Sequence, residues 1–189
     1  MAKVRQRTPL TVVPCKPEAS KMKAMVYGLQ GSGKTFFAME AGKYLGGKVL
    51  VISSEPKDLQ HYAKSYKFSK IEIDRGSDCS LARYAEALEL ACEGDWDLVV
   101  IDSFSDSWDG PKGSLEYVHE VEEKHQFGRW DGVGRQLDGF HNAVNNFPHN
   151  ILVCMRGEEK YKMSRAGGRT EITAEGIQPI CSKTVPFRF

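Results

Sequence analysis

The 189-residue chain has no long hydrophobic run, no internal repeat and no low-complexity tract. Its apolar runs are at most about half as long as a membrane-spanning helix requires. The apolar stretch at 10–13 is also too short for the core of a signal peptide. The five cysteines are odd in number and form no close pairs, so we expect reduced thiols in a cytoplasm. With a net charge of +1 there is no overall basic excess, so any nucleic-acid site must be local.

A glycine-rich motif lies in the first fifth of the sequence. Residues 28–35 read G-x-x-x-x-G-K-T, with an apolar segment at 23–27 before them and no helix breaker from Phe36 until Gly42. Strand, glycine-rich turn and helix in this order form a phosphate-binding loop, where backbone N–H groups and the helix N-terminus attract phosphate. The nucleotide-binding residues predicted from this motif are Gly28, Leu29, Gln30, Gly31, Ser32, Gly33, Lys34, Thr35 and Phe36.

Two side chains of this loop have distinct predicted roles in binding ATP and Mg²⁺. Lys34 is expected to reach the β- and γ-phosphates, and the Thr35 hydroxyl to hold the Mg²⁺. A second metal ligand is expected from 97–102, an acid followed by four consecutive apolar residues and then Asp102. Such a run is typical of a strand covered on both faces, and Asp102 at its carboxyl end would face the loop. The alternative is that Asp102 merely caps the next segment.

Hydrolysis of ATP also needs a group that orients or deprotonates water. Residues 48–54 form another strand-like run, and Glu55 follows it directly, held in an extended conformation by Pro56. A carboxylate at this strand tip indicates a general base directed at the γ-phosphate. Two alternatives stay open: Glu55 is an ordinary solvated loop acid, or Asp74, at the end of 71–74, has this role.

Together these segments resemble RecA-type recombinases, in particular the small phage-encoded RecA-like ATPases of the Sak type. The residues that carry the resemblance lie at 52–58 with 61–64, at 97–111, at 149–156, at 158–162 and at 176–179. The resemblance covers 22–189 and leaves 1–21 as an N-terminal arm. It implies that strand 149–156 lies between the strand of the loop and the strand of Asp102. It also implies that Arg156 senses the γ-phosphate and that the chain is an ATPase stimulated by DNA.

The alternation of strand and helix patterns predicts the fold class. One helical face is expected in 81–92, where Ser80 can cap the helix, and another in 133–144. The residues on these faces are Leu81, Tyr84, Ala85, Leu88 and Cys92, and then Val133, Leu137, Phe140, His141 and Val144. Strands interleaved with helices predict a mainly parallel sheet with helices on both faces. With the resemblance, we expect a three-layer α/β/α RecA-like P-loop NTPase core with a C-terminal β-hairpin.

A local basic segment follows the expected sensor strand. The candidate DNA-binding residues in it are Lys160, Tyr161, Lys162, Arg165 and Arg169. Basic residues around an aromatic ring suit single-stranded DNA, and in RecA-like proteins the loop at this place binds DNA. The alternative is a solvated hairpin with ordinary surface charge. The other DNA loop of the family would fall within 104–134, but that stretch is acidic, and 114–124 reads as a short helix.

The resemblance also implies a homo-oligomer, either a ring or a filament, in which a basic residue of the neighbouring subunit completes the nucleotide site. Possible donors are Lys160, Lys162, Lys183 and Arg188. The proline-bracketed segment 9–14 could add to a neighbour's sheet edge or lie on its own domain. Residues 187–189 look like a further strand. For a phage-encoded protein, the implied location is the bacterial host cytoplasm, and a phage single-strand binding protein is an expected partner.

Three functions are compatible with these patterns. An ATPase that engages single-stranded DNA in annealing or recombination uses the loop, Glu55, Arg156 and the basic hairpin together. A nucleotide-gated protein–protein module, such as a helicase loader or assembly factor, would bind ATP and use the acidic 104–134 segment as its partner surface. A small-molecule kinase is the third, but the sequence has no motif for an acceptor substrate. We expect the first.

Overall fold

The structure is a computed structural model that describes residues 12, 14, 20–55, 59–120, 126–166, 169–183 and 185–188. For 126–127, 164–166, 169–171 and 187–188 it describes the backbone alone. Its elements, in chain order, are β1 (Lys23–Gly28), α1 (Lys34–Leu45), β2 (Val49–Ser53), η1 (Tyr62–Lys64), β3 (Phe68–Glu72), α3 (Leu81–Cys92), β4 (Leu98–Asp102), α4 (Asp106–Asp109), α5 (Ser114–Glu120), α6 (Gln126–Asn145), β5 (Ile151–Ala166), β6 (Arg169–Pro179) and η2 (Val185–Arg188).

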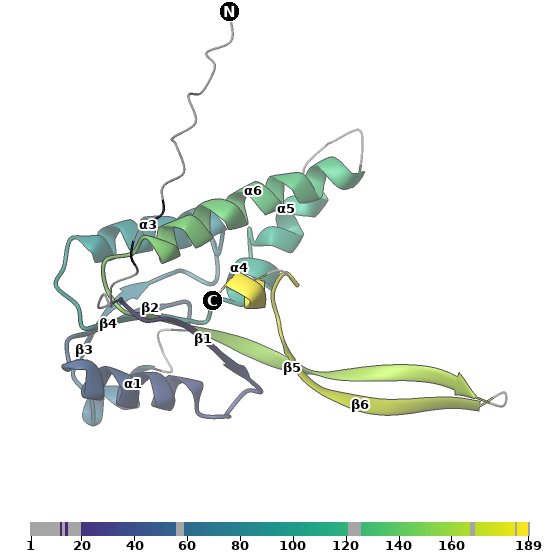
Figure 1. Ribbon diagram of the computed structural model, residues 1–189, viewed down its shortest axis with the longest axis horizontal. Helices are drawn as coiled ribbons and strands as arrows, with labels where there is room; N and C mark the ends of the chain where they lie inside the picture. Colours follow the sequence, from purple (N-terminus) through teal and green to yellow (C-terminus); the bar gives the residue numbers. More distant parts are fainter. Residues whose placement is uncertain are drawn as a thin grey trace, which may run out of the picture.

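The strands form one sheet in the order β1-β5-β4-β2-β3, with all of these pairs parallel and β6 antiparallel to β5. Helices α3 and α6 cover one face of the sheet and α1 covers the other (Figure 1). Strand β5 lies between β1 and β4, as the resemblance implied. The predicted fold class is therefore confirmed: an α/β fold with a parallel five-strand sheet between layers of helices and a C-terminal β-hairpin. Among the described residues, no helix has both the length and the apolar character to cross a membrane.

The buried strands and helices follow the apolar patterns of the sequence. All five residues of β2 are buried, and so are the first four of β4. Ser80 caps α3 by accepting a hydrogen bond from the Arg83 N–H, as predicted. The predicted face of α6 is buried throughout. On α3 the prediction for Cys92 was wrong: the buried stripe runs through Tyr84, Leu88 and Ala91, and Cys92 is one residue beyond it and exposed.

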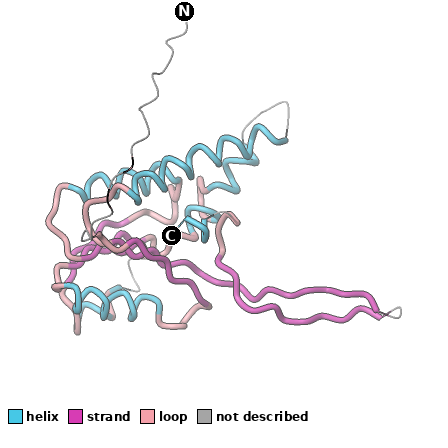
Figure 2. Tube along the Cα trace, in the orientation of Figure 1, coloured by secondary structure: helices cyan, strands magenta, loops and turns pink. Residues whose placement is uncertain are grey.

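The hairpin is longer than the sequence indicated. Strand β5 leaves the sheet after Arg156 without a break and runs on to Ala166, where β6 returns beside it. The two strands project from the rest of the domain as a narrow ribbon (Figure 1), and Figure 2 shows the same arrangement along the backbone. The basic residues on this ribbon therefore lie outside the packed layers.

Two terminal segments differ from expectation or lie outside the description. The predicted C-terminal strand is wrong: Val185–Arg188 form a 3-10 helix, entered through a turn in which the Val185 N–H donates to the Ser182 carbonyl. Pro186 has no N–H to donate to a strand ladder, which favours this turn. The proposed arm at 1–21 and its segment at 9–14 lie outside the described residues, apart from 12, 14, 20 and 21. The predicted helix 114–124 is observed over Ser114–Glu120, and 121–125 are not described.

The contact between α1 and β2 provides a test of this packing. A Cβ atom on Gly42 would lie 2.3 Å from Cγ2 of the buried Val49, whereas a Cβ on Gly139 in α6 meets nothing within 4 Å. We expect Gly42→Ala to lower the free energy of unfolding by about 1–3 kcal/mol, because Val49 is stiff and cannot yield. Gly139→Ala should raise it by up to about 1 kcal/mol. Urea unfolding of both variants measures the difference, and equal effects would contradict the close packing.

Candidate nucleotide site

The glycine-rich loop joins β1 to α1 at the carboxyl edge of the sheet. Gly31 and Gly33 have φ values of 76° and 88°, which side chains rarely permit, and the Phe37 N–H donates to the Gly33 carbonyl to begin the helix. The Lys34 ammonium folds back over the loop and donates to the carbonyls of Gly28 at 2.9 Å and Leu29 at 3.0 Å. Within the described part of the chain, the ammonium donates only to the loop's own backbone, and a triphosphate in the loop can replace these contacts.

The two predicted metal ligands lie in contact with each other. Thr35 Oγ1 donates to Asp102 Oδ2 at 2.6 Å, although the two residues belong to α1 and β4. A hydroxyl and a carboxylate that converge in this way form the hard oxygen donor set that Mg²⁺ prefers. The residues present therefore fit the metal that a P-loop ATPase uses. Alongside them lies a cavity of about 300 Å³, lined by Gln30, Gly31, Gly33, Lys34, Thr35, Glu55, Tyr62, Arg75, Asp102, Ser103 and Arg156.

Glu55 lies on the wall of this cavity, next to the end of β2. Its N–H donates to Ser53 Oγ at 3.0 Å, and its carboxylate forms an ion pair with Arg75 at 3.2 Å. Burial raises the pKa of Glu55 above its ordinary value, Arg75 opposes this change, and Asp106 and Asp102 add to it. The sequence predicted that Glu55 lies at the tip of a strand, and in the structure it lines the same cavity as Lys34.

Asp74, the alternative base, does not line the cavity. Its carboxylate accepts hydrogen bonds from the Gly76 N–H at 2.9 Å and from Ser77 Oγ at 2.7 Å. The Ser77 bond, followed by the Gly76 bond, lowers the pKa of Asp74. With these partners, the Asp74 carboxylate stabilises the turn after β3, which is a structural role.

Arg156 reaches the cavity from β5 and is held there by two carboxylates. Its Nη2 atom donates to Asp106 at 2.8 Å and to Asp109 at 2.6 Å. The backbone N–H of Arg156 donates to Ser105 Oγ at 2.9 Å. The Asp106 side chain is fully buried, and it also pairs with Arg75 Nε at 3.3 Å and accepts a short hydrogen bond from Ser54 Oγ. One buried carboxylate thus orients two arginines at the edge of the nucleotide cavity.

The sequence did not indicate Asp106 or Arg75 as site residues. In the sequence, Asp106 is one of several acids in the segment 104–134, and Arg75 follows the strand-like segment 71–74 with no motif around it. The single available signal was position, because Asp106 follows the Asp102 strand by four residues and Arg75 follows β3 by three. Their burial and pairing depend on contacts with strands that lie far away in the chain.

The predicted DNA-binding residues lie apart from this cavity, on the hairpin. Lys160 is paired with Glu175 at 2.9 Å, and Tyr161 is about half exposed and bonded to Glu159. Lys162 is exposed. Arg165 lies near the end of β5 and Arg169 begins β6, and their side chains are outside the described part.

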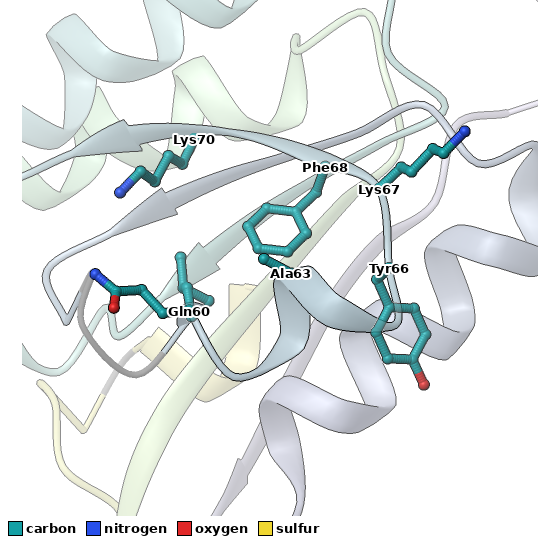
Figure 3. Close-up of a pocket in the computed structure, with 7 residues that line it drawn as sticks. Gln60, Ala63, Tyr66, Lys67, Phe68 and Lys70 are labelled. Carbon is teal, nitrogen blue, oxygen red and sulfur yellow. The ribbon is translucent and has the colours of Figure 1, made fainter.

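Two further cavities do not share residues with the nucleotide cavity. One of about 880 Å³ lies at the base of the hairpin, where the rings of Trp108 and Trp130 are 5.9 Å apart and Lys160 and Lys183 stand at the wall. The other, of about 400 Å³, lies at the β3 edge of the sheet, against the Phe68 ring (Figure 3). The first adjoins the predicted DNA-binding hairpin, and the second does not.

A comparison with protein families agrees with a P-loop ATPase. A family model described as an AAA domain matches residues 20–185. A crystal structure of the RadB recombinase is similar over 87% of this chain and 70% of its own, with 19% identity and a TM-score of 0.48. No curated protein matches this chain.

The buried Asp106 carboxylate gives a stability prediction. Asp106→Ala should lower the free energy of unfolding by about 2 kcal/mol or more, because Arg75 and Arg156 lose a buried partner. As a control, Asp95 forms an exposed pair with Lys48, and Asp95→Ala should change the free energy by less than about 0.5 kcal/mol. Urea unfolding compares the two. An Asp106→Ala protein as stable as the Asp95→Ala protein would contradict the role of the buried carboxylate.

Proposed function

The chain belongs to the AAA-domain family of P-loop ATPases, and we propose that it couples ATP hydrolysis to the binding of single-stranded DNA in recombination or annealing. The observation that supports hydrolysis is the convergence of Lys34, Thr35, Asp102, Glu55 and Arg156 on one cavity. Lys34 and Thr35 belong to α1, and the other three side chains come from β4, β5 and the segment after β2. Such a set can bind a triphosphate and also act on the water that attacks it.

The proposed chemistry uses residues with separate tasks. ATP binds with its phosphates in the loop, where Lys34 turns from the Gly28 and Leu29 carbonyls toward the phosphate oxygens. Thr35 and Asp102 would hold Mg²⁺, which would supply positive charge beside the phosphates. Glu55 accepts a proton as the water oxygen bonds to the γ-phosphorus and the bond to the β-phosphate oxygen breaks.

Arg156 supplies a second positive charge on the wall of the cavity. Its guanidinium is oriented by Asp106 and Asp109, so its position does not depend on the nucleotide. A preorganised cation of this kind stabilises charge that develops on the γ-phosphate. The sensor role of Arg156 is therefore part of the proposal.

Hydrolysis is tested by replacing the base and the lysine separately. Glu55→Gln keeps the size and hydrogen bonding of the side chain but cannot take the proton, so turnover should fall roughly 100-fold or more while ATP affinity stays near normal. Lys34→Ala should abolish hydrolysis because it removes the cation at the β- and γ-phosphates. Steady-state turnover and equilibrium ATP binding measure both effects. Normal turnover in Lys34→Ala would refute the site, and normal turnover in Glu55→Gln would make Glu55 a loop acid.

The DNA part of the proposal rests on the hairpin and on the groove at its base. Lys160, Tyr161 and Lys162 are exposed and belong to β5. Beyond the sheet, β5 and β6 form a ribbon that leaves the domain (Figure 1). Trp108 and Trp130 lie at the foot of this ribbon, and Trp130 is 41% exposed. Lysines and exposed aromatic rings in one continuous region suit the phosphates and bases of a single strand. The same proposal includes three further points. The chain is a phage-encoded protein of the Sak type, it assembles as a homo-oligomer, and its partner is a phage single-strand binding protein.

The salt dependence of DNA binding tests this surface. Each phosphate contact should add about 0.7 to the slope of log affinity against log salt for a single strand. Replacing Lys160, Lys162, Arg165 and Arg169 together by alanine should flatten the slope and weaken binding. Tyr161→Ala should weaken the binding of single-stranded DNA by about 1–3 kcal/mol if a base stacks on the ring. ATP binding should stay normal in these variants, because the hairpin lies outside the core.

A matched control removes the same number of charges elsewhere. Four exposed lysines serve for this: Lys43 on α1, Lys64 on η1, Lys67 in the loop after η1, and Lys70 on β3. Replacing these four by alanine should leave the salt slope nearly unchanged. Titration of labelled single strands at two salt concentrations compares the variants. Identical curves for the hairpin variant and the wild type would favour a nucleotide-gated protein–protein module instead.

A further inference from the structure

Arg75 lies on the wall of the nucleotide cavity, next to the proposed base Glu55. Its guanidinium touches two carboxylates: Nη1 is 3.2 Å from Glu55, and Nε is 3.3 Å from the fully buried Asp106. The planar fork of an arginine suits two partners in different directions, whereas an ammonium offers a point charge. Arg75 therefore bridges the proposed base to the buried carboxylate that also holds Arg156.

The turn after β3 brings Arg75 to this place. The Ile73 N–H donates to the Ser53 carbonyl at 2.8 Å, which extends the pairing with β2 beyond Glu72. Asp74 then closes the turn: its carbonyl accepts from the Ser77 N–H at 3.0 Å, and its carboxylate accepts from Gly76 and Ser77. Arg75, between Asp74 and Gly76, is thus held near the carboxyl end of β2, where its guanidinium meets Glu55.

The charges around Glu55 show what Arg75 offsets. Burial and the carboxylates of Asp106 and Asp102 favour the neutral acid, and Arg75 is the first opposing influence, ahead of Arg156. Lys34 and Tyr62 line the same cavity. A base must be ionised to accept a proton, so a carboxylate in these surroundings needs a nearby cation to remain active near neutral pH.

We propose that Arg75 is the positioning residue of the Glu55 carboxylate, which it ties to the buried Asp106 and holds toward the γ-phosphate. This inference rests on Glu55 acting as the base. Arg75 acts through Glu55 and contacts no substrate. Its loss should therefore lower turnover with little effect on ATP affinity, and should be felt most at acid pH, where Glu55 is protonated more readily without it.

The test compares Arg75→Gln with a matched arginine variant. Arg83 is 52% exposed against 48% for Arg75, and it also pairs with a glutamate, but on the outer surface of α3. For Arg75→Gln we expect a turnover roughly tenfold lower at pH 6 and within about threefold of wild type at pH 8.5, with KM changed by less than about twofold. Arg83→Gln should behave as wild type. Arg75→Lys keeps the charge and should recover part of the lost turnover. This variant replaces Arg75→Gln in the test if the glutamine variant does not fold.

Two further measurements separate this inference from the proposed function. NMR titration of the Glu55 carboxyl, in protein without nucleotide, should show its midpoint at higher pH in Arg75→Gln than in wild type or Arg83→Gln. The double variant Glu55→Gln, Arg75→Gln should be no slower than Glu55→Gln alone, because both changes act on one group. An unchanged midpoint, additive losses or a large pH-independent rise in KM would overturn the role of Arg75. Normal turnover in Glu55→Gln would instead overturn the proposed base, and the role of Arg75 with it.

Discussion

Parallel pairing of β1, β5, β4 and β2 is the constraint on which the site depends. Parallel strands end at one edge of a sheet, so the glycine-rich loop, Arg156, Asp102 and Glu55 meet there although they span more than a hundred residues of sequence. The all-apolar β2 and β4 fix this register, because both are covered on the two faces by helices. The chemistry of the site is thus a consequence of strand order.

A buried charge sets the arrangement at that edge. The fully buried Asp106 carboxylate is compensated by Arg75 and Arg156, and a hydroxyl group donates to it as well. An isolated buried carboxylate is strongly unfavourable, so the two arginines and Asp106 must be placed together. The same contacts turn one guanidinium toward Glu55 and keep the other on the cavity wall. Structural stability and catalytic geometry therefore depend on the same group of side chains.

Local signals in the sequence predicted the phosphate-binding loop, the buried strands and the strand tips that carry Asp102 and Glu55. A motif of fixed spacing and uninterrupted apolar runs indicates these without tertiary contacts. Asp106 and Arg75 could not be predicted in the same way, since an acid or an arginine in a polar segment is usually solvated, and only pairing across strands buries these two. The length of the hairpin was also missed, because β5 continues as a strand through a largely charged and solvent-exposed stretch.

The central claim is that one cavity binds the triphosphate and hydrolyses it with Glu55. A crystal structure with Mg²⁺ and a non-hydrolysable ATP analogue tests this most directly. We predict phosphates in the loop at 28–35, Lys34 Nζ released from the carbonyls of Gly28 and Leu29, and Thr35 and Asp102 beside the metal. The Glu55 carboxylate should lie within one water molecule of the γ-phosphate. A nucleotide bound elsewhere, or Glu55 turned away from the γ-phosphate, would contradict the account.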